Sequence, residues 1–191
     1  MKSKEFSQEE LIALLDSVSG KSTEERKNVI TALFKEKLPE GVYIVYGDTD
    51  ESRLFSDCTL IDRKDVSGIA IKIDNPAGSG SYYLVRALKY EEDGEWQASM
   101  DLASKRRIAG GQAFLPDANQ LFACFDKRDD MDAAAALLGG EVADKFNLGW
   151  HWCSRAVASE YAVGISMNNG HVNYYHRNVN AHALLFSAFK C

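Results

Sequence analysis

The chain has 191 residues, a formal net charge of −6, 46% hydrophobic residues and 26% charged residues. These values are typical of one soluble globular domain, or of one domain with an appendage. They give no reason to expect nucleic acid or an anionic membrane surface as a partner, because both would favour a basic chain.

We expect no signal peptide in this sequence, because its first seven residues contain two lysines and no apolar run follows. No stretch approaches the ~20 apolar residues of a membrane span, so we expect no direct membrane insertion. The cysteines are scattered without zinc-ligand spacing, which is typical of a reduced, cytosolic set. They are Cys58, Cys124, Cys153 and Cys191. We expect a cytoplasmic or virion-associated protein; a cell-surface location would require that a leader had been removed.

Residues 1–40 are predicted to form a helical prefix. Ser7-Gln-Glu-Glu10 is a capping-box pattern, and apolar residues follow it at helical spacing until Gly20. Ser22-Thr-Glu-Glu25 repeats the signal, and a second apolar stripe ends at Pro39. Such a helix pair either docks a partner or packs on the body of its own chain. We favour the second interpretation, because amphipathic helices usually bury their apolar stripe within their own fold.

The hydrophobic period changes from helix-like to strand-like after the prefix. The segment Val42–Tyr46 is rich in residues that favour strands. Isoleucines alternate with other residues over 69–73, residues 75–81 form a turn-rich stretch, and an apolar run follows. Residues 66–90 are therefore predicted to form a β-hairpin.

Three helices are predicted after the hairpin. The first begins at Trp96 and extends to about Arg107. Pro116 and Asp117 suit the start of the second. The third is the alanine-rich stretch from Met131 to Leu138, which a pair of glycines ends.

Residues 150–189, close to the C-terminus, contain three apolar-alternating runs separated by polar turns, which is a strand pattern. The order helices, strands, helices, strands predicts an α+β fold with a mostly antiparallel sheet. We place this domain in residues 41–191, after the helical prefix. Trp150 and Trp152 are expected to anchor the sheet, and the closing segment should be core or partly core at Leu184, Phe186 and Phe189.

The segment 168–182 has an unusual composition. Ten of its fifteen residues are Asn, His or Tyr, and it contains no Asp, Glu, Lys or Gln. About a quarter of ordinary residues are charged, whereas here only Arg177 is. Asn, His and Tyr offer adaptable hydrogen bonds and flat amphipathic area, as in antibody paratopes. The alternative is a plain polar hairpin in which Asn serves the turns.

Twelve residues in the second half of the chain fall in a recognisable register. They are Gly110, Gly111, Leu115, Pro116, Leu121, Trp152, Ser154, Ala162, Gly170, Val172, Ala188 and Phe189. This register resembles the major-paralogous-domain group of C-type-lectin-fold proteins, which shows a Gly-Gly-Trp-Arg-Leu-Pro-Thr step, a Trp-Ser-Ser-Thr-Glu strand and a closing Val-Arg-Pro-Val-x-Ala-Phe. The resemblance covers roughly residues 66–189 and implies a C-type-lectin-like fold there.

The chain departs from the group's pattern at four places. Ala113-Phe114 stand where Trp-Arg is usual, Cys153 replaces a serine, and Val163 replaces a tryptophan. The closing Val-Arg-Pro is replaced by residues 184–186. A salt bridge of the missing arginine is therefore not expected here, whereas the closing strand is.

Within this fold, the composition of 168–182 resembles the variable proteins of diversity-generating retroelements. In that subgroup, adenine-directed mutagenesis rewrites asparagine AAC codons, which can become Asn, Tyr, His, Ser, Ala, Arg, Val or Gly but not Lys, Glu, Gln, Met or Trp. Every residue of 168–182 fits that set. Trp150, Trp152, Glu160 and Met167 fall outside it, so the resemblance implies that they are fixed framework between variable, ligand-binding positions.

We therefore expect the ligand surface to lie between Arg155 and His182. On a strand, Asn173, Tyr175 and Arg177 would share the face opposite Tyr174 and His176. The candidate ligand-binding residues are Arg155, Val157, Ser159, Tyr161, Ser166, Asn168, Asn169, His171, Asn173, Tyr174, Tyr175, His176, Asn178, Asn180 and His182.

The sequence gives little support to metal or enzyme chemistry. The four histidines do not form a His-x-x-x-His pair, and no carboxylate lies among the last three. Calcium needs several carboxylate oxygens, which 168–182 does not supply. The formylglycine-generating enzymes share a related fold and use cysteines, but the residues around Cys153 and Cys191 do not resemble theirs. We expect no catalytic residue, no metal and no cofactor.

The sequence thus predicts a non-enzymatic, adhesin-like or receptor-binding-like protein, with a protein or a glycan as its ligand. The alternative is a structural component of a phage particle or cell surface without a ligand site of its own. Neither the ligand nor the oligomeric state follows from the sequence.

Overall fold

The computed structural model describes residues 19–20, 38–47, 53–55, 66–74, 80–91 and 93–190. The chain divides into two compact units, Met1–Glu36 and Lys37–Cys191. Apart from a few residues, the predicted helical prefix lies outside the described residues.

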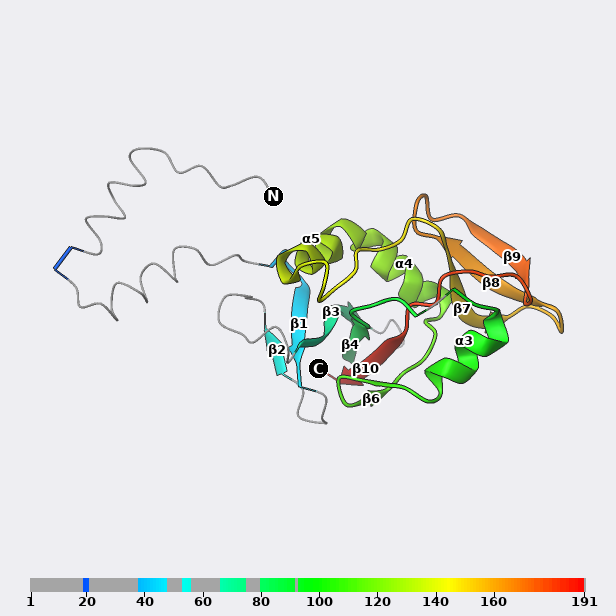
Figure 1. Cartoon of the computed structure of the whole chain (residues 1–191), viewed down its shortest axis with the longest axis horizontal. Helices are drawn as coiled ribbons and strands as arrows, with labels where there is room; N and C mark the ends of the chain where they lie inside the picture. Colours follow the sequence, from blue (N-terminus) through cyan, green and yellow to red (C-terminus); the bar gives the residue numbers. More distant parts are fainter. Residues whose placement is uncertain are drawn as a thin grey trace. The chain divides into compact units, whose positions relative to one another are not determined.

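A five-stranded antiparallel sheet forms one half of this unit (Figure 1). Its strands, in spatial order, are β10 (Phe186–Lys190), β4 (Ser81–Arg86), β3 (Val66–Asp74), β1 (Val42–Tyr46) and β2 (Arg53–Phe55). The predicted strand at 42–46 and the predicted hairpin at 66–90 are confirmed, the hairpin as β3 and β4. The closing strand β10 returns from the end of the chain to pair with β4.

Helix α3 (Trp96–Ala103) is shorter than predicted, because it ends before Arg107. The side chain of Gln112 explains the early end, since its Nε2 donates to the carbonyls of Ala103 at 3.0 Å and Arg106 at 2.9 Å. The following residues turn back instead, and β5 (Arg107–Ile108) pairs with β6 (Gly111–Gln112).

The second helix begins where the sequence predicts, and the third begins at Arg128, three residues before the predicted Met131. Helix α4 (Ala118–Asp126) begins after Asp117, whose carboxylate accepts from the Gln120 N–H at 2.8 Å. The Asp117 N–H in turn donates to Gln120 Oε1 at 2.9 Å, which completes a capping box. Helix α5 (Arg128–Leu138) ends at Gly139, which has a φ of 92°. No helix of the described residues is long and apolar enough to cross a membrane.

The predicted C-terminal strands form a second, three-stranded antiparallel sheet. It consists of β7 (Trp150–Ala156), β8 (Tyr161–Ser166) and β9 (Val172–His176), in that spatial order. Two mostly antiparallel sheets with helices between them confirm the α+β class.

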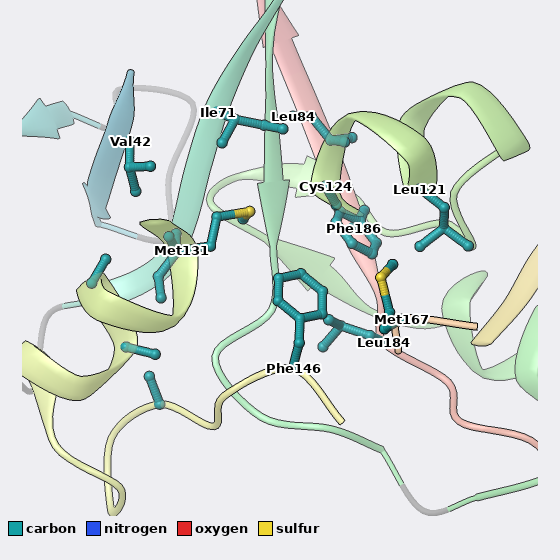
Figure 2. Packing of buried hydrophobic residues seen from close by; sticks show 14 of the residues in the cluster. Val42, Ile71, Leu84, Leu121, Cys124, Met131, Phe146, Met167, Leu184 and Phe186 are labelled. Atoms are coloured by element: carbon teal, nitrogen blue, oxygen red, sulfur yellow. The ribbon is translucent and has the colours of Figure 1, made fainter. Parts of the chain in front are cut away.

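Two apolar clusters hold the sheets and helices together. The first joins β1, β3, β4 and β10 to helices α4 and α5, with Phe146, Met167, Leu184 and Phe186 at its centre (Figure 2). The second contains Trp152 together with Trp96 and Leu115. The expected core role of the closing segment is confirmed: Leu184 and Phe186 are buried, and Phe189 is half-buried.

Candidate ligand-binding surface

The β8–β9 hairpin, residues 161–176, carries most of the predicted ligand-binding positions. Its turn is built by short polar residues, as Asn–Asn–Gly sequences favour. The Gly170 N–H donates to the Ser166 carbonyl at 2.9 Å, and Asn169 Oδ1 accepts from the His171 N–H at 3.1 Å. Gly170 has a φ of 71°, and a Cβ there would lie 3.2 Å from the Phe125 ring. Glycine is therefore required both by the backbone and by the packing on α4.

The hairpin has two different faces, divided as the sequence predicts. Its register places Tyr174 opposite Val163 and Tyr175 opposite Ala162, so the two neighbouring tyrosines point to opposite sides. Tyr175 packs edge-on against Trp150, with ring centroids 5.0 Å apart. A Cβ on Gly164 would lie 3.1 Å from the Tyr175 ring. Tyr175 therefore packs against the framework of the sheet, although the sequence groups it with the displayed residues.

Eleven of the predicted positions are exposed to solvent. They are Arg155, Val157, Ser159, Tyr161, Asn168, Asn169, His171, Asn173, Tyr174, Asn178 and Asn180. Tyr174 is the most exposed large apolar side chain of the described residues, at 60%. Ser166, in contrast, is buried, and its hydroxyl accepts from the Asn168 N–H at 3.3 Å. A ligand cannot reach that side chain, so Ser166 is removed from the candidate surface.

Exposed apolar side chains concentrate in the same segment. Six large apolar residues are exposed in the described part of the chain, and all but Leu148 fall within 157–179. They are Val157, Tyr161, Val172, Tyr174 and Val179. Val172 and Val179 are not among the residues predicted to bind ligand, although both lie in the charge-poor segment 168–182. We call these five side chains, with the exposed asparagines around them, the display surface.

The charged side chains beside the display surface are mostly engaged by their neighbours. The guanidinium of Arg177 lies 4.4 Å from the centre of the Trp96 ring and donates to the Ala158 carbonyl at 2.8 Å. The half-buried His176 lies 3.7 Å from a carboxylate oxygen of Glu160. This leaves a surface that is rich in aromatic and amide groups and poor in free charge.

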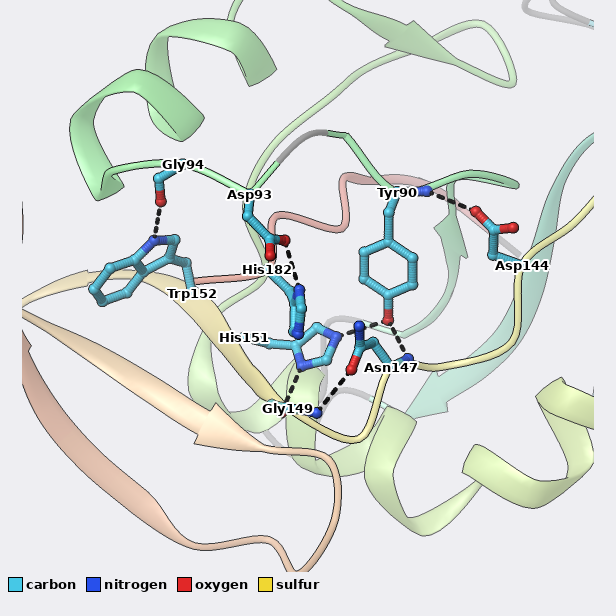
Figure 3. A network of polar contacts seen from close by, with 9 residues as sticks. All are labelled: Tyr90, Asp93, Gly94, Asp144, Asn147, Gly149, His151, Trp152 and His182. Atoms are coloured by element: carbon cyan, nitrogen blue, oxygen red, sulfur yellow. Dashed lines mark hydrogen bonds and ion pairs between the residues drawn. The ribbon is translucent and has the colours of Figure 1, made fainter. Parts of the chain in front are cut away.

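Two of the four histidines belong to a polar network at the base of β7 (Figure 3). The Tyr90 hydroxyl lies 2.7 Å from His151 Nε2 and accepts from the Asn147 N–H at 2.9 Å. His151 Nδ1 lies 3.1 Å from the Gly149 carbonyl. Burial lowers the pKa of His151 to about 4, so its imidazole is neutral at pH 7. A neutral His151 ring satisfies both contacts if its Nδ1–H donates a hydrogen bond to the Gly149 carbonyl and its Nε2 accepts a hydrogen bond from the Tyr90 hydroxyl.

His182 completes this network rather than the display surface. Its Nδ1 lies 2.5 Å from Asp93 Oδ1, and its backbone carbonyl accepts from the Trp152 N–H at 3.1 Å. A Cβ on Gly149 would lie 2.5 Å from His182 Nε2, so the imidazole edge rests on the Gly149 backbone. His182 therefore fastens β7 to the segment around residue 93, and we assign it to the framework.

Metal binding and a reactive cysteine are the two chemical alternatives that the sequence raises. In the described ranges, no group of His, Cys, Asp and Glu side chains is arranged to hold a metal ion. Cys153 is buried, and desolvation raises its pKa to about 12, so its thiol is protonated and inaccessible at neutral pH. No protein-family model matches the chain, and the search of curated proteins returns no match.

Proposed function

We propose that this protein binds a protein or glycan ligand through the display surface and performs no catalysis. One observation carries the proposal: of the six large apolar side chains that are exposed among the described residues, five lie within 157–179, among amide and imidazole groups. Scattered exposed apolar residues are ordinary, but a concentration of them in and next to one hairpin is typical of an interaction site. Tyrosine and asparagine are also the residue types that suit adaptable recognition.

The support beneath the display surface fits this role. Tyr175 packs on Trp150, Trp152 is buried and donates from Nε1 to the Gly94 carbonyl at 2.8 Å, and Met167 is fully buried. A rigid base lowers the entropic cost of binding, because the displayed groups are already positioned. Substitutions of the exposed side chains of the display surface would leave these supporting residues unchanged.

We further propose that the scaffold is C-type-lectin-like and of the retroelement-variable type. The division between buried framework and exposed surface supports it, since Trp152 and Met167 cannot arise from an AAC codon and both are buried. Glu160 also cannot arise from an AAC codon, but unlike Trp152 and Met167 it is exposed, and its carboxylate lies near His176. The closing strand expected from the resemblance pairs with β4.

A binding experiment tests the proposed function. The full chain is screened against a glycan array and a displayed library of random peptides, and the ligands obtained are measured again on the variant Tyr161→Ala/Val172→Ala/Tyr174→Ala. We expect at least tenfold weaker binding, because the large aromatic anchors of an interface contribute most of its affinity.

The matched control is Leu148→Ala, which removes the one large apolar side chain of the described residues that is exposed outside the display surface. It should bind every selected ligand as the wild type does. Equal binding by the triple variant, or no ligand in either screen, contradicts the proposal and favours a purely structural role.

A further inference from the structure

Strand β9 is the outer strand of the second sheet, with β8 on one side and no described strand on the other (Figure 1). Two hydrogen bonds fix its orientation. The Arg177 N–H donates to the Glu160 carbonyl at 2.8 Å, and the Ser166 N–H donates to the His171 carbonyl at 2.9 Å. Bonded and non-bonded pairs alternate along an antiparallel ladder. The odd-numbered residues of β9 therefore bond β8, and the backbone groups of the even-numbered residues point away from it.

Only some of these outward groups have partners. The Tyr174 N–H donates to Asn173 Oδ1 at 2.9 Å, and the His176 carbonyl accepts from the Val179 N–H at 3.0 Å. Among the described residues, neither backbone group of Val172 nor the Tyr174 carbonyl has a hydrogen-bond partner. An edge of this kind is a template for another strand, and proteins usually protect it with lysine, proline or a bulge. β9 has none of the three.

We propose that β9 pairs antiparallel with β9 of a second copy of this chain, about a twofold axis at Asn173. In this register Val172 lies opposite Tyr174 of the partner subunit. The Val172 N–H donates to the carbonyl of that residue, and its own carbonyl accepts the N–H of that residue. Symmetry repeats both bonds. The Tyr174 N–H exchanges Asn173 Oδ1 for a backbone carbonyl, and the bond between Val179 and His176 is kept.

The side chains of this edge favour a second copy as the occupant. Val172 and Tyr174 are 47% and 60% exposed, and the register places a β-branched side chain beside an aromatic one on both sides of the axis. Arg177, the only charged residue of 168–182, would face Asn169 of the partner subunit, so no like charges meet. The contact is isologous and closes on itself.

The pairing would join the two three-stranded sheets into one continuous sheet with two display surfaces on it. A ligand with repeated epitopes would then engage both surfaces, which raises its overall affinity without new contacts. The pairing involves Val172 and Tyr174, which also belong to the display surface, but it is measured as dimerisation and does not require that the protein binds a ligand.

Sedimentation velocity of the full chain over a range of concentrations tests the dimer. Asn173→Asp keeps an oxygen for the Tyr174 N–H but places two carboxylates directly across the axis. Its dimer should dissociate at a roughly fivefold higher concentration than the wild type, since like charges directly opposite destabilise a strand pair. Asn180→Asp adds the same charge away from the edge, and its dimer should match the wild type. A wild-type monomer at every concentration, or equal behaviour of the two variants, overturns the pairing.

A cysteine at the axis tests the register. The two copies of residue 173 would form a non-bonded pair with Cα atoms about 4.5 Å apart, which is within disulfide range. In a Cys58→Ser/Cys191→Ser background, mild oxidation of Asn173→Cys should give a covalent dimer, whereas Asn180→Cys should not. Equal yields of covalent dimer from both variants contradict the twofold axis at Asn173.

Discussion

At the scale of single residues, two neighbouring tyrosines illustrate what the sequence can and cannot predict. Nothing in the composition of 168–182 distinguishes Tyr174 from Tyr175, and strand alternation indicates only that they face opposite ways. The structure places Tyr175 against Trp150 and over Gly164, whereas Tyr174 is exposed. The difference depends on Gly164 and Trp150, which lie on two other strands, so a local pattern cannot reveal it.

The two tyrosines should therefore respond differently to truncation. Tyr175→Ala removes the ring that covers Gly164 and should lower the free energy of unfolding by about 2 kcal/mol, since the site is half-buried. Tyr174→Ala should change it by no more than about 0.5 kcal/mol, as surface substitutions usually do. Urea unfolding of both variants measures the difference. Equal destabilisation would mean that the Tyr174 ring is also part of the packing.

Arg86 is a second residue that the sequence gives no reason to single out. It is fully buried, its Nη2 donates to the Asp144 carbonyl at 2.5 Å, and its guanidinium lies 4.8 Å from the Phe146 ring centre. Its Nε and Nη1 have no hydrogen-bond partner in the described part of the chain. A buried, partly satisfied charge of this kind is costly, and burial lowers its pKa.

Replacement of Arg86 by an apolar residue of similar length should therefore be tolerated. We expect Arg86→Met to unfold at a urea concentration equal to or above that of the wild type, because it removes the buried charge and fills the same space. Arg86→Ala should be less stable by roughly 2–4 kcal/mol, because it leaves a cavity. If Arg86→Met were as unstable as Arg86→Ala, the guanidinium itself would be required.

At the scale of elements, the features that depend on local sequence signals were predicted correctly, whereas the features that depend on long-range contacts were not. The strand at 42–46 and the hairpin at 66–90 follow from apolar spacing, and the start of α4 follows from its capping residues, whereas α3 begins at Trp96 without a side-chain cap. The end of α3 does not follow from local signals, because Gln112 comes from a later segment and closes its last turn. The same limit applies to β7. Tyr90, 61 residues earlier in the chain, contacts His151, and Asp93 contacts His182, whose backbone carbonyl accepts from the Trp152 N–H.

The network beneath β7 predicts a specific acid sensitivity. Burial lowers the folded-state pKa of His151 from 6.5 to about 4, so the unfolded chain takes up a proton first as the pH falls. The stability that depends on neutral His151 is complete above about pH 6.5 and is lost progressively down to about pH 4. The expected loss is about 3 kcal/mol.

Urea unfolding between pH 7 and pH 4 measures this loss. His151→Gln keeps an acceptor for the Tyr90 hydroxyl but does not titrate, so its stability should fall by less over the range. The control His171→Gln changes an exposed histidine in the hairpin and should keep the wild-type pH dependence. If the free energy of unfolding depends on pH in the same way in both variants, His151 is not the source of the acid sensitivity.

At the scale of the whole molecule, the second unit combines a packed interior with one surface of different composition. The two apolar clusters lie around the five-stranded sheet and the helices, and the display surface lies on the outer hairpin of the second sheet. If the display surface is a target of sequence diversification, the coding DNA should distinguish its variable positions from the fixed positions of the interior.

We expect an imperfect repeat of the hairpin's coding sequence near the gene, beside a reverse-transcriptase gene. The repeat should carry AAC codons at exposed positions such as Asn173, Tyr174 and Asn178, and should match the gene at Trp152 and Met167. Sequencing of the flanking DNA tests this directly. Absence of both the repeat and the reverse transcriptase would remove the retroelement proposal and leave the binding proposal as it stands.

The turn at the tip of the hairpin also has a chemical consequence over time. Asn–Gly pairs lose ammonia when the glycine nitrogen attacks the asparagine side chain. In the folded hairpin, the Gly170 N–H is held by the Ser166 carbonyl and the Asn169 side chain is held by the His171 N–H. Folding thus restrains both reacting groups, and each opening of the hairpin releases them. The rate at which acidic, deamidated forms accumulate during storage would therefore record how often this hairpin opens.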